Sequence, residues 1–117
     1  MKTEEELISK IKHNLHELEI EAYGERRHGN KEMPPNIHHF LHYFKDLYQA
    51  AYDLGSIDEQ EYVPQMNIDM MYDVEREVEG ELYYIIEKKN NRELIADLLP
   101  ALLLRIQGSL SCIIDKI

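Results

Sequence analysis

The chain begins with a stretch in which apolar residues recur every three or four positions, the spacing that places them on one face of an α-helix. These residues are Leu7, Ile11, Leu15, Leu18 and Ala22. Thr3 precedes the stretch and Glu6 follows three residues later, as in an N-terminal capping box. The pattern predicts a first helix that starts after Thr3 and ends near Tyr23, where Gly24 interrupts it.

A second and cleaner amphipathic pattern follows a segment that breaks helices. Residues 24–36 contain two glycines and two prolines and predict a loop. Asn36 can cap the helix that follows, and Gly55 is expected to end it. The predicted core face of this helix consists of Ile37, Phe40, Leu41, Phe44, Leu47, Tyr48, Ala51 and Leu54.

The third segment, residues 67–89, has an ambiguous period. Its apolar residues Met71, Val74, Val78, Leu82 and Ile85 fit a helix. Its acidic residues alternate with apolar ones from Asp73 to Glu81, as they would in a strand. We predict a helix, because Glu and Met favour helices whereas Asp and Glu are depleted in strands. Gly80 counts against this choice, and the alternative is a hairpin within residues 72–98 that turns at Asn90 and Asn91.

The last segment, residues 92–117, is apolar over about half of its circumference. Its apolar residues are Leu94, Ile95, Leu98, Leu99, Leu102, Leu103, Ile106, Leu110, Ile113, Ile114 and Ile117. Pro100 lacks a backbone N–H, so we expect the helix to be kinked or broken there. A helix so broadly apolar is either central to a bundle or shared with another chain, and this surplus predicts a homodimer.

Four helical segments with short connections predict an all-α fold, an antiparallel four-helix bundle in which residues 1–117 form a single helical domain. The 44% of hydrophobic and 31% of charged residues are typical of a globular protein. Cys112 is the only cysteine and lies on the apolar side of the last helix, so it is predicted to pack in the core. A single cysteine excludes an internal disulfide and fits the reducing cytoplasm.

The net charge of −10 makes free nucleic acid and anionic membranes poor partners. Nearly all of the excess lies in one stretch, because Asp53 to Glu81 hold ten acids and only Arg76 as a base. The most apolar run, Leu94 to Ile114, contains Asp97, Pro100 and Arg105 and is a poor membrane span.

Motifs that would indicate catalysis or a cofactor are missing, so we predict no catalytic residue, no cofactor and no metal site. The sequence has no Gly-rich phosphate loop and no Gly-x-Ser-x-Gly motif. His38 and His42 have the spacing that lets two imidazoles share a metal, but they fall opposite the apolar face. Glu75 and Glu79 resemble the clustered magnesium ligands of MazG-type pyrophosphohydrolases, although that family's flanking signatures are missing. A helical enzyme or metal-binding protein that uses His38, His42 or the carboxylates from Glu75 to Glu81 is the alternative function.

The acidic stretch is interleaved with tyrosines, which are enriched at protein interfaces because the ring supplies area while the hydroxyl stays hydrated. We expect carboxylates around such rings to steer a basic protein partner. The predicted partner-binding residues are Tyr72, Glu75, Arg76, Glu79 and Tyr83. The leading prediction is therefore a small acidic, non-enzymatic protein-binding module, such as an inhibitor, an immunity protein or a regulator.

Overall fold

The computed structural model describes residues 3–23, 27–28, 31–32, 36–57, 68–89 and 92–115. Four long helices dominate it: α1 (Glu4–Tyr23), α2 (Ile37–Ile57), α3 (Ile68–Tyr84) and α4 (Arg92–Ser109). The shorter elements are the strands β1 (Arg27–His28) and β2 (Lys31–Glu32), the π-helical turn η2 (Ile85–Lys89) and the helix α5 (Ser111–Ile114). Ile117 and the Cys112 side chain, both predicted to lie on the apolar face of the last segment, fall outside the described residues.

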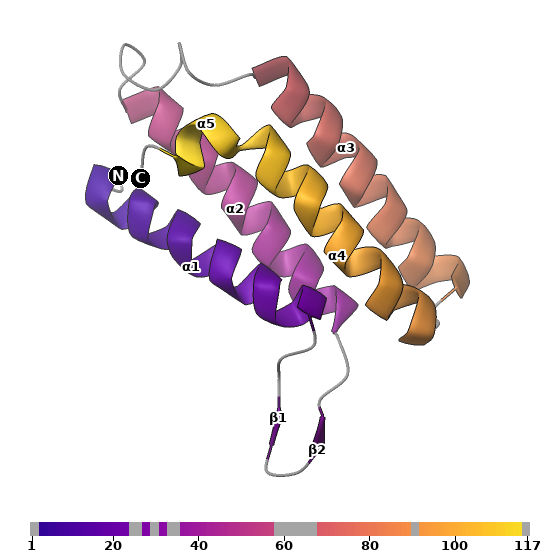
Figure 1. Cartoon of the computed structure of the whole chain (residues 1–117). Coiled ribbons are helices and arrows are strands. Elements are labelled where there is room, and N and C mark those ends of the chain that lie inside the picture. Colours follow the sequence, from indigo (N-terminus) through magenta and orange to yellow (C-terminus); the bar gives the residue numbers. More distant parts are fainter. Residues whose placement is uncertain are drawn as a thin grey trace.

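The long helices form an antiparallel bundle, as the sequence predicts (Figure 1). α1 packs against α2 and α4, whereas α3 packs against α4 and, to a smaller extent, α2. α3 therefore lies at one edge of the bundle, on the far side of α4 from α1 (Figure 1). The segment predicted as a loop between α1 and α2 contains the two-residue strands, which pair antiparallel with Arg27 opposite Glu32.

Side-chain caps start the first two helices where the sequence places them. The Thr3 hydroxyl accepts a hydrogen bond from the Glu6 amide at 3.2 Å. The Asn36 side-chain oxygen accepts from the amides of His38 and His39 at 3.0 and 3.1 Å. The Asn36 amide in turn donates to the buried Glu21 carboxylate at 2.9 Å, which ties the end of α1 to the start of α2. The predicted stop at Gly55 is wrong, because α2 continues to Ile57.

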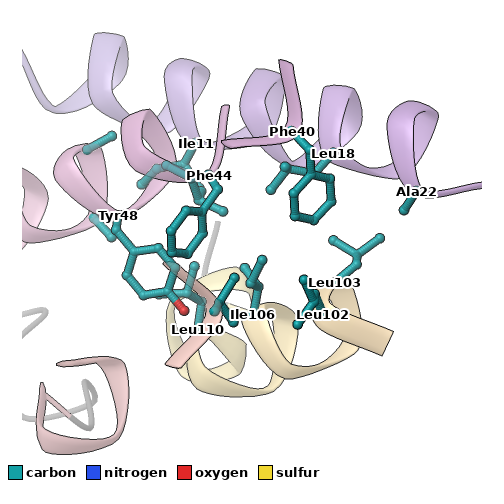
Figure 2. Close-up of a cluster of buried hydrophobic side chains, with 14 of the residues drawn as sticks. Ile11, Leu18, Ala22, Phe40, Phe44, Tyr48, Leu102, Leu103, Ile106 and Leu110 are labelled. Carbon is teal, nitrogen blue, oxygen red and sulfur yellow. The ribbon is translucent and has the colours of Figure 1, made fainter. Parts of the chain in front are cut away.

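The centre of the core lies between α1, α2 and α4, and α3 adds Met71, Val78 and Leu82 to the same cluster. Figure 2 shows the rings of Phe40, Phe44 and Tyr48 on α2 between the side chains of α1 and α4. These three rings are fully buried. Tyr48 reaches across the bundle, and its hydroxyl hydrogen-bonds the Ser109 hydroxyl at 2.5 Å. Ser109 itself donates to the Ile106 carbonyl at 2.8 Å, which makes Tyr48 the donor of the buried pair.

The third segment is helical, so the hairpin alternative is wrong. α3 runs from Ile68 to Tyr84, and its buried residues Met71, Val78 and Leu82 follow the helical period. Gly80 does not stop the helix, because the cost of one glycine, about 1 kcal/mol, is smaller than the gain from burying these apolar side chains.

Pro100 does not break the last helix. α4 continues through Pro100 from Arg92 to Ser109, and the helical run is interrupted only at Leu110, before α5. Burial of Leu99 and Leu102 on both sides of the proline outweighs the roughly 3 kcal/mol that a proline costs inside a helix.

The chain's own helices cover most of the apolar face of α4. The buried side chains of this face are Leu99, Leu102, Leu103, Ile106 and Leu110. The side chains of Leu94 and Ile95 lie outside the described residues. None of the helices in the described ranges has the length and apolarity needed to cross a membrane.

Candidate functional site

The five residues predicted to bind a partner surround one hollow on the outer side of α3. Tyr72, Glu75, Arg76, Glu79 and Tyr83 line it together with Gly80, and its volume is about 560 Å³. They come together because positions three, four and seven apart share one side of a helix. Their role in binding stays a prediction.

One end of the hollow is an aromatic stack between α2 and α3. The ring of Tyr72 is 54% exposed and stacks on Tyr52, with the centroids 5.1 Å apart. The Tyr52 hydroxyl donates to the Glu75 carboxylate at 3.0 Å. Burial raises the pKa of Glu75 above its usual range, and burial together with the Glu75 carboxylate raises the pKa of Tyr52. The stack fixes the orientation of the Tyr72 ring and leaves about half of this residue exposed to solvent.

The other end of the hollow is held by a cation from α2. The Lys45 ammonium donates to the Tyr83 hydroxyl at 2.6 Å and lies 3.8 Å from the Glu79 carboxylate. The hydrogen bond to Tyr83 raises the pKa of Lys45. Tyr83 and Glu79 therefore serve first as a contact between α2 and α3, a role that the sequence does not predict.

On the opposite flank of α3 a second cation reaches across from α4. Arg105 pairs with the carboxylates of Glu77 and Glu81, at 3.3 Å for Glu81. Glu75 and Glu79 thus face α2, whereas Glu77 and Glu81 face α4. The strand-like alternation of acids in the sequence has this physical origin, since residues two apart on a helix fall on opposite flanks of its buried stripe.

Most acids of α3 take part in contacts within the protein, which the sequence alone does not show. Asp73 pairs with Arg76, and Glu75 accepts a hydrogen bond from the Tyr52 hydroxyl. Glu79 pairs with Lys45, whereas Glu77 and Glu81 both pair with Arg105. α3 carries six acids and one arginine, and the two cations from its neighbours leave an excess of three negative charges. The surface remains acidic, but most of its charge also holds the bundle together.

A second hollow lies between α3 and α4 and adjoins the first at Arg76 and Gly80. It is mainly apolar and has a volume of about 520 Å³. Tyr84, Ile85 and Leu98 form its apolar lining, and its remaining lining residues are Glu77, Glu81 and Arg105. Tyr84 is 55% exposed. Sequence reasoning missed this groove, because Leu98 and Tyr84 meet only when α4 folds against α3.

The groups of the alternative function do not converge. His38 and His42 are both exposed, and His42 lies 3.5 Å from the Asp46 carboxylate. The carboxylates between Glu75 and Glu81 divide between two flanks of α3. Among the described residues, no group of three His, Cys, Asp or Glu side chains is placed to hold a metal ion.

Comparison of the chain with protein-family models, curated proteins and solved structures finds no match. The inference of function therefore depends on the surface chemistry of this chain.

Proposed function

We propose that this protein is a non-enzymatic binding module, an inhibitor, immunity protein or regulator, that recognises a basic protein through the outer face of α3. The observation that carries the proposal is the gathering of partly exposed tyrosines Tyr72, Tyr83 and Tyr84 along the two adjoining hollows of one acidic helix. Aromatic rings at the centre of an interface supply most of its binding energy, and charges around them steer the encounter.

Tyr72 is the strongest candidate for a binding hot spot. Its stacking on Tyr52 orders the ring before a partner arrives, so that little side-chain entropy is lost on binding. Tyr83 is less suitable as a test position, because its removal would also break the hydrogen bond from Lys45 that links α2 to α3.

The test is capture of partners from native lysate by the wild-type protein, a Tyr72→Ala variant and a Tyr23→Ala variant. Tyr23 on α1 is 52% exposed and provides a matched control away from α3. We expect a basic protein to be captured by the wild type and by Tyr23→Ala, to be lost from Tyr72→Ala, and to bind less in high salt. Identical captured sets for all three proteins would refute the proposal.

A homodimer and a cytoplasmic location are separate proposals. The single cysteine supports a reducing compartment, which fractionation of the source cells would check. For a second copy, the surface to test is the exposed side of α4, where Leu104 is 63% exposed between Ala101 and Gly108. Light scattering that gives a dimer for the wild type and a monomer for Leu104→Glu would support a homodimer. A monomeric wild type at tens of micromolar would exclude it over that range.

A further inference from the structure

Gly80 occupies a position in α3 that the fold of this chain does not require to be glycine. It is exposed inside a regular helix, where glycine is less favourable than alanine. A Cβ atom added there would meet no atom within 4 Å, and its backbone is not in the left-handed region that favours glycine. Neither crowding nor backbone strain within the described residues accounts for the missing side chain.

Gly80 is also the point at which the two hollows meet. One hollow leads from it towards Tyr72 and Tyr83, and the other towards Tyr84 and Leu98. The outer surface of α3 therefore has a depression at Gly80, and tyrosine side chains project from the helix on both sides of it. Small residues at such a point let the backbone of another helix approach closely, towards the short end of the roughly 8 to 10 Å range of interaxial distances.

We propose that a basic amphipathic helix of the partner crosses α3 at Gly80 and seats an apolar side chain in the groove between α3 and α4. This inference rests on the proposed function and specifies its partner. The groove runs between two antiparallel helices, so a helix that crosses α3 at a shallow angle also follows the groove and packs as an additional member of the bundle. Tyr84, Ile85 and Leu98 offer the anchor residue an apolar site.

Charge decides between a partner of this kind and a second copy of the chain. Two copies that met through α3 would place the same excess against itself, three negative charges on each side once Lys45 and Arg105 are counted. Like charges placed opposite one another oppose association, whereas lysines flanking the anchor of a partner helix would face the excess carboxylates.

The test uses matched glycine variants and a defined probe. Gly80→Ala and Gly108→Ala both add a methyl group at an exposed helical position where a Cβ meets nothing within 4 Å. Both should raise the Tm by about 2 to 5 °C, because alanine favours the helix. The probe is a synthetic helix of leucine and lysine with an amphipathic period, compared with a scrambled peptide of the same composition and with a version that has glutamate in place of lysine.

We expect the amphipathic basic peptide to bind the wild type more tightly than either control peptide. Gly80→Ala should weaken this binding about ten-fold or more, the size of a hot-spot effect. Gly108→Ala should stay within about two-fold of the wild type, since it lies off the groove. Because Gly80→Ala is expected to be the more stable protein, its loss of binding would not reflect unfolding. Tyr84→Ala should weaken binding in the same way, with Tyr23→Ala as its control.

The outcomes separate this inference from the proposed function. If the amphipathic peptide binds no better than its controls, or if the two glycine variants bind it equally, the helix crossing is wrong. Capture of a basic protein that depends on Tyr72 would then still support the proposed function. If Gly80→Ala instead converts a dimeric wild type into a monomer in light scattering, the occupant is a second copy and the proposed partner helix is wrong.

Discussion

α2 and α3 are both amphipathic helices, but the bundle holds them in different ways. α2 buries nine of its 21 residues, and a buried hydrogen bond from Tyr48 to Ser109 joins it to α4. α3 buries three of its 17 residues. Most of the remaining attachment of α3 comes from partly exposed polar contacts along its two flanks, to Lys45 and Tyr52 on α2 and to Arg105 on α4.

This difference indicates how one bundle can combine stability with an open surface. Burying an apolar side chain contributes about 1.5 to 3 kcal/mol, whereas an exposed ion pair contributes about 0 to 1 kcal/mol. α3 is therefore expected to be the long helix that opens most easily, at a lower free energy than global unfolding. The tyrosines and Gly80 lie on this least buried helix, because a residue that contacts a partner cannot also be covered by the core.

The largest expected effect comes from removing a core ring of α2. Phe44→Ala should lower the free energy of unfolding by about 3 to 5 kcal/mol and reduce hydrogen-exchange protection in α1, α2 and α4 together. Leu82→Ala on α3 should cost less, towards the low end of about 2 to 5 kcal/mol, and should reduce protection mainly in α3. If both variants lose hydrogen-exchange protection to the same extent in all four long helices, α3 unfolds only together with the whole bundle.

A smaller effect should appear at alkaline pH, through the buried hydroxyl of α2. Burial raises the pKa of Tyr48 from 10 to about 12, so the folded protein retains this proton where the unfolded chain loses it. The contribution of Tyr48 to stability is therefore complete below pH 10 and is lost as the pH rises through 12, by roughly 2 to 3 kcal/mol. Urea unfolding between pH 9 and 12 should show a shallower decline for Tyr48→Phe than for the wild type. Parallel declines would contradict this role.

The smallest effects are expected for the polar contacts of α3. Arg105→Gln should lower the free energy of unfolding by about 0.5 to 1 kcal/mol in dilute buffer, because Arg105 pairs with two carboxylates across the helix interface. The loss should shrink in ~1 M salt, where charges are screened within about 3 Å. Arg76→Gln is the matched control, since Arg76 pairs only with Asp73 on the same helix in the described contacts. An equal loss for both variants would mean that Arg105 does not fasten α3 to α4.

The sequence was sufficient for features that depend on neighbouring residues. Thr3 and Asn36 cap their helices as predicted, because a cap is a hydrogen bond within one turn. The apolar stripes of α1 and α2 were correctly placed, since helical periodicity determines which residues share a face. The same periodicity brought Tyr72, Arg76 and Tyr83 to one side of α3, so most of the candidate surface could be predicted.

Tertiary contacts decided the rest. Pro100 and Gly55 are exceptions to local rules, and burial outweighs their intrinsic cost. In the sequence the acids of α3 form one acidic stretch, and only the positions of Lys45 and Arg105 on neighbouring helices show that they form two flanks. The groove at Gly80 exists because α4 lies beside α3. Local propensity and period act within a few residues, whereas the pairing of charges and the shape of a groove depend on residues that are distant in the chain and meet only when the helices pack.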